Sequence, residues 1–261
     1  MKVVFFGSGG VEAPVLETLE KNFDLSLVVR SKDIHSSSEI LKLLDGSSAE
    51  VGVVANFGHI IPAEVLEFFP KGIINVHPSL LPKYRGPTPV QTAILNGDKT
   101  TGVTIIKIDE DIDHGPILEQ KEVEILPVET SKHLLERLFK IGAEMLPNTI
   151  SKYIKEEIKP SNQDDIKATF TQVLTKEAGF LDLESVPGKE KLDRMIKAFF
   201  PWPGVWFRTE INGKKVTIKL LPQNKIQVEG KNPQNFTDFK NGYKEGEEIL
   251  KKLGYNTAAT A

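Results

Sequence analysis

The stretch Val3-Val4-Phe5-Phe6-Gly7-Ser8-Gly9-Gly10 joins an apolar run of β-strand type to a glycine-rich turn. Residues 11–22 follow with apolar side chains at helical spacing, which predicts a helix after the turn. The same order of strand, turn and helix then repeats, with apolar strand-like runs at residues 25–29, 51–55 and 72–76. Because this rhythm places helices on the faces of a parallel sheet, the first half is predicted to be an α/β domain with a doubly wound sheet.

The chain changes character after a polar stretch between Lys155 and Thr169, which we interpret as a domain boundary. Beyond it, short strands are predicted at residues 205–211 and 216–221, and Asn212-Gly213 between them is typical of a hairpin turn. We therefore expect a Rossmann-like, mostly parallel sheet domain over residues 1–168. A smaller β-rich domain, of barrel type, is expected over residues 169–261.

Composition limits the functional classes. Of the 261 residues, 39% are hydrophobic and 26% are charged, which is ordinary for a globular protein. Cysteine is absent, which excludes disulfides, thiolate metal sites and a cysteine nucleophile. The sequence shows no apolar run long enough to cross a bilayer and no signal-peptide pattern, so we expect no membrane partner and a cytoplasmic location.

Charge is distributed unevenly, although the formal net charge is only −3. Between Thr171 and Lys225 there are ten Lys and Arg residues against six Asp and Glu residues. A local basic excess is compatible with a phosphate-bearing partner and equally with a solvated surface. The chain as a whole does not have the charge of a strongly basic nucleic-acid binder.

The stretch Asn75-Val76-His77-Pro78-Ser79-Leu80-Leu81-Pro82-Lys83-Tyr84-Arg85-Gly86 places polar groups at the end of an apolar strand. Asn75 and His77 are two residues apart, so in an extended chain their side chains project from the same face. Open α/β sheets build their sites at the carboxyl ends of strands. A lone histidine is more often structural than catalytic, but the paired asparagine and the strand-end location favour a site here.

A second polar cluster, Asp109-Glu110-Asp111-Ile112-Asp113-His114-Gly115-Pro116, follows another predicted strand. It is compatible with a solvated acidic turn. A calcium loop is disfavoured, because the spacing and the terminal glutamate of that motif are missing. In the third interpretation, the loop offers backbone groups to a ligand and one carboxylate to the chemistry.

The glycine turn itself does not match a dinucleotide-binding motif. The G-x-G-x-x-G spacing requires glycine where the chain has Glu12, and no acidic residue closes the second strand, which ends at Val29-Arg30. A dehydrogenase is therefore disfavoured.

Three motifs together resemble the formyltransferase family. They are the Asn75–Gly86 stretch, Thr101-Gly102-Val103-Thr104, and Asp113 with the Gly115-Pro116-Ile117 that follows it. The stretch Ala198-Phe199-Phe200-Pro201-Trp202-Pro203-Gly204-Val205-Trp206 resembles the C-terminal domain of the methionyl-tRNA members, which has an OB-like barrel. The resemblance implies an enzyme that moves a formyl group from 10-formyltetrahydrofolate to a primary amine.

Carried over by position, the catalytic residues are Asn75, His77 and Asp113. An amide donor and an imidazole suit the oxyanion that develops when an amine attacks a formyl carbon. The carboxylate suits positioning of the imidazole and transfer of the proton that leaves the amine. No metal is expected, since His77 has no partner at metal-ligand spacing.

The resemblance also implies where the folate and the acceptor bind. The cofactor-binding residues are expected to be Phe57, Gly58, His59, Ile60, Ile61, Ser79, Leu80, Leu81, Pro82, Asp109, Glu110, Asp111 and Ile112. Leu80 and Leu81 could equally belong to the core. Arg85 is expected either to pair with a phosphate of the acceptor or to cap its loop.

The chain departs from the methionyl-tRNA members between Ser31 and Ser48, where a shorter stretch replaces their basic loop. Initiator methionyl-tRNA is nevertheless the expected acceptor and partner, because of the C-terminal motif and the local basic excess. The alternative is an N-formyltransferase acting on a nucleotide-linked amino sugar. A non-catalytic binding protein is disfavoured, because all three catalytic residue types are present. The oligomeric state is left open.

Overall fold

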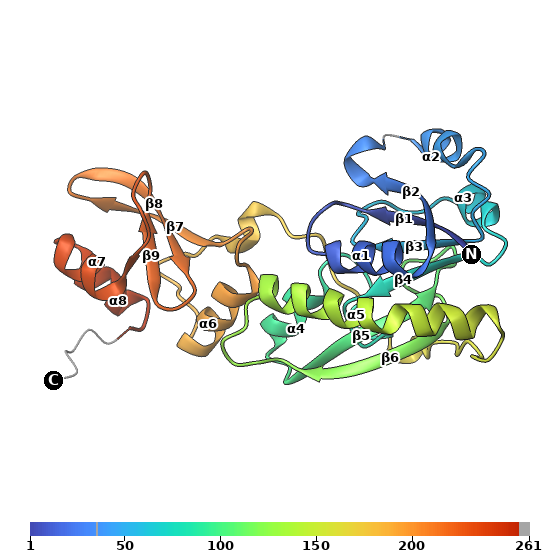
Figure 1. The fold of residues 1–261 in the computed structure, drawn as a ribbon. Helices are drawn as coiled ribbons and strands as arrows, with labels where there is room; N and C mark the ends of the chain where they lie inside the picture. Colours follow the sequence, from blue (N-terminus) through green and yellow to red (C-terminus); the bar gives the residue numbers. More distant parts are fainter. Residues whose placement is uncertain (35, 256–261) are drawn as a thin grey trace. The chain divides into compact units, whose positions relative to one another are not determined.

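The computed structural model describes residues 1–34 and 36–255. The chain forms two compact units, whose elements are labelled in Figure 1. The first unit comprises Met1–Val90, Lys99–Ile125 and His133–Gln172, and the second comprises Gln91–Asp98, Leu126–Lys132 and Val173–Ala261. The predicted boundary between a catalytic domain over residues 1–168 and a smaller domain over residues 169–261 stays a prediction.

The first unit is built on a six-stranded sheet with the order β2-β1-β3-β4-β5-β6. The strands are β1 (Lys2–Gly7), β2 (Asp24–Arg30), β3 (Val51–Ala55), β4 (Ile73–His77), β5 (Thr100–Lys107) and β6 (Ile117–Glu124). The first four run parallel, whereas β5 pairs antiparallel with β4 and β6 pairs antiparallel with β5. The sheet is therefore mixed but mostly parallel.

The parallel strands are connected by α1 (Ala13–Asn22), α2 (Ser37–Leu44) and α3 (Ala63–Phe68), with the short 3₁₀ turn η1 (Ser31–Asp33) before α2. The long helix α5 (Ser131–Ile154) and the 3₁₀ turn η2 (Asp165–Lys167) follow β6. Val4, Phe6 and Ile73 face a buried cluster that includes residues of α2 and α3. On the other face, Gly142 of α5 lies so close to Val76 that any larger residue would collide with it. The green-to-yellow α5 runs along the strands in Figure 1.

The second unit contains a four-stranded antiparallel sheet with the order β10-β9-β8-β7. Its elements are α4 (Pro89–Asn96), η3 (Lys176–Gly179), α6 (Lys189–Ala198), β7 (Val205–Ile211), β8 (Lys214–Leu221), β9 (Lys225–Val228), β10 (Gln234–Asn235), α7 (Phe236–Gly242) and α8 (Gly246–Lys252). Asn212 and Gly213 have φ angles of 50° and 75°, as a tight two-residue hairpin requires. The predicted fold class, a Rossmann-like domain followed by a smaller β domain, is confirmed.

None of the helices in the described part of the chain combines the length and apolar character needed to span a membrane.

Candidate active site

Asn75 and His77 lie on β4, with His77 as its last residue. Their side chains share one face of the sheet because they are two residues apart, while Val76 between them points towards α5. Neighbouring β3 runs parallel, and its Val54 pairs with Asn75. The loop after β3 therefore begins beside these two polar side chains.

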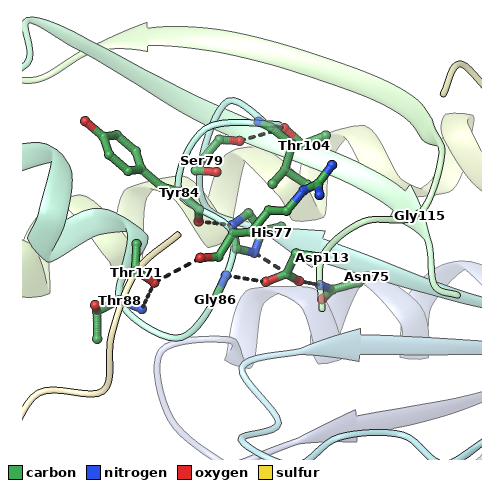
Figure 2. A network of polar contacts seen from close by, with 12 residues as sticks. Asn75, His77, Ser79, Tyr84, Gly86, Thr88, Thr104, Asp113, Gly115 and Thr171 are labelled. Carbon is green, nitrogen blue, oxygen red and sulfur yellow. Dashed lines mark hydrogen bonds and ion pairs between the residues drawn. The ribbon is translucent and has the colours of Figure 1, made fainter. Parts of the chain in front are cut away.

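The loop between β5 and β6 carries Asp113 to the same place (Figure 2). Oδ1 of Asp113 accepts a hydrogen bond of 3.1 Å from Nδ2 of Asn75 and lies 3.4 Å from Nδ1 of His77. Oδ2 accepts a hydrogen bond of 2.8 Å from the backbone N–H of Gly86. The carboxylate is thus held at both oxygens, and its side chain is only 15% exposed. The structure brings together the three residues that the sequence proposed as catalytic.

The ring of His77 is held from both sides. Its Nε2 lies 3.1 Å from the carbonyl oxygen of Tyr84, and because a carbonyl can only accept, Nε2 carries a hydrogen. The second nitrogen, Nδ1, then faces Asp113. An imidazolium at this position would have an acceptor for each of its N–H groups. The geometry therefore suits a histidine that gains and releases a proton at Nδ1.

Arg85 is buried and directly precedes Gly86, whose backbone amide binds Asp113. Its Nη2 lies 2.7 Å from Oδ1 of Asp165, and its Nε and Nη2 donate to Oε1 of Gln163 at 3.1 and 2.9 Å. The guanidinium holds the pKa of the Asp165 carboxyl below its usual value. These contacts tie the Arg85 side chain to the segment that contains Gln163 and Asp165. Both alternatives, a cap for its own loop and pairing with a phosphate of the acceptor, stay predictions.

His114 joins the acidic loop to the segment that contains Asp165. Its Nδ1 lies 2.6 Å from Oδ2 of Asp109 and its Nε2 lies 3.5 Å from Oδ2 of Asp165. The hydrogen bond to Asp109 raises the pKa of His114, and partial burial of the ring opposes that shift. His114 was not among the proposed site residues, and it acts on the loop rather than on the three catalytic candidates.

Residues 79–82 form a turn that follows directly from β4. Ser79 and Leu81 are buried, and the hydroxyl of Ser79 donates to the carbonyl of Lys83 at 2.7 Å. The hydroxyl of Thr104 donates to the carbonyl of Ser79 at 2.6 Å and accepts from the N–H of Leu81 at 3.1 Å. Ser79 and Leu81 thus hold the turn in place, and the half-buried Leu80 and Pro82 present more surface.

The two loops proposed to border the folate each present exposed apolar surface. In the loop after β3, Phe57 and Ile61 are buried in the core, whereas Ile60 is 73% exposed. In the acidic loop, Ile112 is 55% exposed. Phe57 and Ile61 therefore anchor their loop, and residues 58–60 are the part that can meet a ligand. The binding roles of both loops stay predictions.

Glu12, which stands where a dinucleotide-binding motif would need glycine, fills the turn after β1. It is buried, and its Oε1 accepts hydrogen bonds from the N–H groups of Gly9 and Gly10, the latter at 3.1 Å. Its Oε2 accepts from Nδ2 of Asn56 at 3.1 Å. Nη1 of Arg30 lies 3.8 Å from Oε1. The backbone N–H groups that hold a phosphate in dinucleotide-binding folds are here occupied by the chain's own carboxylate.

Gln163 escaped the sequence analysis. It donates to two carbonyls of the acidic loop, those of Asp113 and Gly115, both at 2.8 Å. Thr104 and Gly86 lie in the motifs but had no role assigned to them, and they support the turn and the carboxylate, as Figure 2 shows. Nothing in the local pattern around Gln163 distinguishes it from its polar neighbours. Across residues 1–34 and 36–255, no three His, Asp or Glu side chains gather in a group able to hold a metal ion.

The family model described as formyl transferase matches residues 1–150, more than half of the chain. The chain belongs to this family. The methionyl-tRNA formyltransferase of Chloroflexus aurantiacus is 45% identical over 167 residues, which are 64% of this chain and 53% of that protein. The chain thus spans about half the length of such curated relatives. The methionyl-tRNA formyltransferase of Caldanaerobacter subterraneus subsp. tengcongensis is 30% identical over 98% of this chain and 89% of that protein.

Solved structures share the fold of this formyl transferase family member. Methionyl-tRNA formyltransferase from Clostridium thermocellum superposes with a TM-score of 0.65 and 18% identity, covering 90% of this chain and 98% of that one. A sugar N-formyltransferase from Shewanella sp. gives 0.64 and 21%, covering 85% and 98%. HypX from Aquifex aeolicus, solved with tetrahydrofolic acid, gives 0.67 and 17%, covering 84% and 37%. At these identities the likeness establishes the fold.

Proposed function

We propose that this protein transfers a formyl group from 10-formyltetrahydrofolate to the amino group of initiator methionyl-tRNA. The observation that carries the proposal is the convergence of Asn75, His77 and Asp113 at the end of β4. An amide, an imidazole and a carboxylate around one point are the groups that acyl transfer to an amine requires.

Asn75 is positioned to stabilise the oxyanion that forms when the amine attacks the formyl carbon. Its amide has two hydrogens, and the hydrogen bond to Asp113 uses one of them. The other is left for the formyl oxygen. Because Asn75 is held at Asp113 before any substrate arrives, the donor needs little reorganisation during the reaction, which is the condition for strong electrostatic stabilisation.

His77 and Asp113 together can receive the proton that the attacking amine loses. Nε2 of His77 is committed to the carbonyl of Tyr84, so the proton is received at Nδ1, which faces the carboxylate. Asp113 stabilises the resulting imidazolium. The proton then passes to the nitrogen of the departing tetrahydrofolate, directly or through water. This assigns proton transfer to His77 and positioning to Asp113.

The exposed apolar parts of the two loops fit a flat heterocyclic ring. Ile60 and Ile112 offer apolar surface, and Gly58 has no neighbouring heavy atom within 4 Å of where a side chain would begin. The loop after β3 starts beside Asn75, and the acidic loop itself carries Asp113. We therefore propose that residues 58–60 and 109–112 contact the folate.

The names of the curated relatives and the basic excess in residues 171–225 support methionyl-tRNA as acceptor. One observation favours the alternative, a nucleotide-linked amino sugar. The segment after β2, residues 31–48, carries two basic and three acidic residues and so offers no basic surface to a nucleic acid. The alignment with the Caldanaerobacter relative extends over 287 residues against the 261 of this chain, so that relative has residues without a counterpart here.

A competition between acceptors tests the proposal. Purified protein and 10-formyltetrahydrofolate are offered methionyl-tRNA, uncharged tRNA or a nucleotide-linked amino sugar, and formylated product and released tetrahydrofolate are measured. We expect product with methionyl-tRNA only, with kcat/KM falling steeply as salt rises. Formylated product with the amino sugar alone would overturn methionyl-tRNA as the acceptor. If folded protein formylates neither methionyl-tRNA nor the amino sugar, the proposed function is overturned.

A further inference from the structure

Gln163 connects three parts of the site through one side-chain amide. Its Nε2 donates to the carbonyl oxygens of Asp113 and Gly115, both at 2.8 Å, and its Oε1 accepts two hydrogen bonds from the guanidinium of Arg85. The orientation of the amide follows from these partners, because carbonyls only accept and a guanidinium only donates. Only a side-chain amide, that of Gln or Asn, combines two N–H donors with a carbonyl acceptor.

The segment that Gln163 holds is conformationally demanding. Asp113 has a φ of 49°, in the left-handed region that costs a residue with a side chain about 1–2 kcal/mol. Gly115 lies so close to the carbonyl of Lys107 on β5 that a Cβ atom would stand 1.8 Å from its oxygen. The two carbonyls on either side of His114 both turn towards Gln163. This backbone shape aims the carboxylate of Asp113 at Asn75 and His77.

We propose that Gln163 is a positioning residue, which fixes the backbone of Asp113 and thereby places its carboxylate for catalysis. This inference rests on the proposed function. Gln163 is not itself directed at the reacting atoms, and its effect passes through the two carbonyls it binds. An error of about 1 Å in the place of a catalytic group can cost about 10²-fold in rate.

The substitution Gln163→Glu separates the two functions of the amide. A carboxylate of the same shape can still accept from Arg85, and the added charge strengthens that pair. It cannot donate to the carbonyls of Asp113 and Gly115, and it repels them. Asn162→Asp is the matched control, because it adds the same charge at the adjacent exposed residue. Gln163→Ala removes the donor and the acceptor together. Its kcat compared with that of Gln163→Glu shows how much further activity falls when the contact with Arg85 is also lost.

Two readouts are measured on the full chain. The first is steady-state kinetics, in which we expect Gln163→Glu to lower kcat by about 10- to 100-fold with KM for both substrates changed less than threefold. The second is amide hydrogen exchange of the peptide covering residues 108–116, which needs no activity. We expect faster exchange there in Gln163→Glu and unchanged exchange in Asn162→Asp.

The outcomes distinguish this inference from the proposed function. One outcome is that the wild type formylates no amine while amide hydrogen exchange in residues 108–116 still rises in Gln163→Glu. In that case the proposed reaction is wrong, but Gln163 does hold the backbone of the Asp113 loop. If the wild type is active and Gln163→Glu matches it in kcat, the positioning role is overturned. Unchanged exchange in residues 108–116 overturns it as well, whatever the activity. An equal kcat loss in Asn162→Asp would attribute the effect to charge alone and overturn it too.

Discussion

Two carboxylates in the first unit are held in nearly the same way. Glu12 accepts from the N–H groups of Gly9 and Gly10 and from the side-chain amide of Asn56. Asp113 accepts from the N–H of Gly86 and from the side-chain amide of Asn75. Each carboxylate thus accepts from glycine backbone N–H groups, two for Glu12 and one for Asp113, and from one asparagine amide. Each also lies in the connection that follows a strand, β1 for Glu12 and β5 for Asp113.

The remaining partner of each carboxylate makes the difference. Glu12 has Arg30 at 3.8 Å, a group that stays charged and cannot pass on a proton, and the carboxylate is almost wholly buried. Asp113 has Nδ1 of His77 at 3.4 Å, and an imidazole is a side chain that proteins use as a general acid or base. The first arrangement closes a turn, and the second has the means to do chemistry. Carboxylate burial alone would not have separated the two.

The sharpest test of this contrast is to remove one charge from each site. Asp113→Asn should lower kcat by about 10³-fold, because the imidazolium of His77 loses its counter-charge and the new amide hydrogens face donors. Glu12→Gln should leave kcat within about threefold in protein shown to be folded. Steady-state kinetics on both variants measures the difference. Equal kcat losses would mean that the two carboxylates do not differ in function.

The asparagines of the two sites should differ in the same sense. Asn75→Ala should lower kcat by about 10²-fold, since it removes the proposed oxyanion donor. Asn56→Ala serves as the matched control, because the side-chain amide of Asn56 donates to the structural carboxylate of Glu12. Full turnover in the Asn75 variant would remove Asn75 from the mechanism.

For stability, in contrast to activity, we expect the larger loss from the variant at Glu12 and the smaller loss from the variant at Asp113. Glu12→Ala leaves the amide of Asn56 and the N–H groups of Gly9 and Gly10 without their buried acceptor. We expect the free energy of unfolding to fall by about 2–4 kcal/mol, measured from urea denaturation. Asp113→Ala should cost less, because its carboxylate is more exposed. A larger loss for Asp113→Ala would show that the supposed active-site carboxylate is the more structural of the two.

The smallest effect concerns His114, which has two carboxylate partners at the edge of the Asp113 loop. Its pKa is raised, so its contribution to stability is fully present below the ordinary value of 6.5 and is lost as the pH rises through the higher pKa of the folded state. Because the ring is more than a third exposed, we expect less than about 1 kcal/mol. Urea midpoints of the wild type and His114→Asn should differ most below pH 6.5 and converge at high pH. Parallel curves would contradict this.

Local patterns predicted the regular elements well. The strand bounds at 205–211 agree with β7, and the expected helix and strands of the first unit lie where the apolar periodicity placed them. Helices α4 and α7 were not predicted. Both are short, and α4 follows Pro87 in a stretch that reads locally as a turn. Such helices are stabilised by tertiary packing rather than by their own propensity.

The catalytic candidates were predicted for two different reasons. Asn75 and His77 are neighbours in sequence, so the period of a strand was enough to place them on one face. Asp113 was one of four acidic residues in a run of five, and only the family resemblance singled it out. In the structure it is the one that reaches β4, because the loop turns at its left-handed backbone.

By itself, the sequence determined the order of strands and helices, the strand-end location of Asn75 and His77, and the absence of thiol chemistry. These follow from local rules, the period of a strand or a helix and the residues available. Only the tertiary structure decided which carboxylate faces His77, that Arg85 lies buried against Gln163 and Asp165, and that Glu12 fills the glycine turn. Each of these contacts joins groups whose meeting depends on how loops return to the sheet, and no local pattern in a chain encodes that.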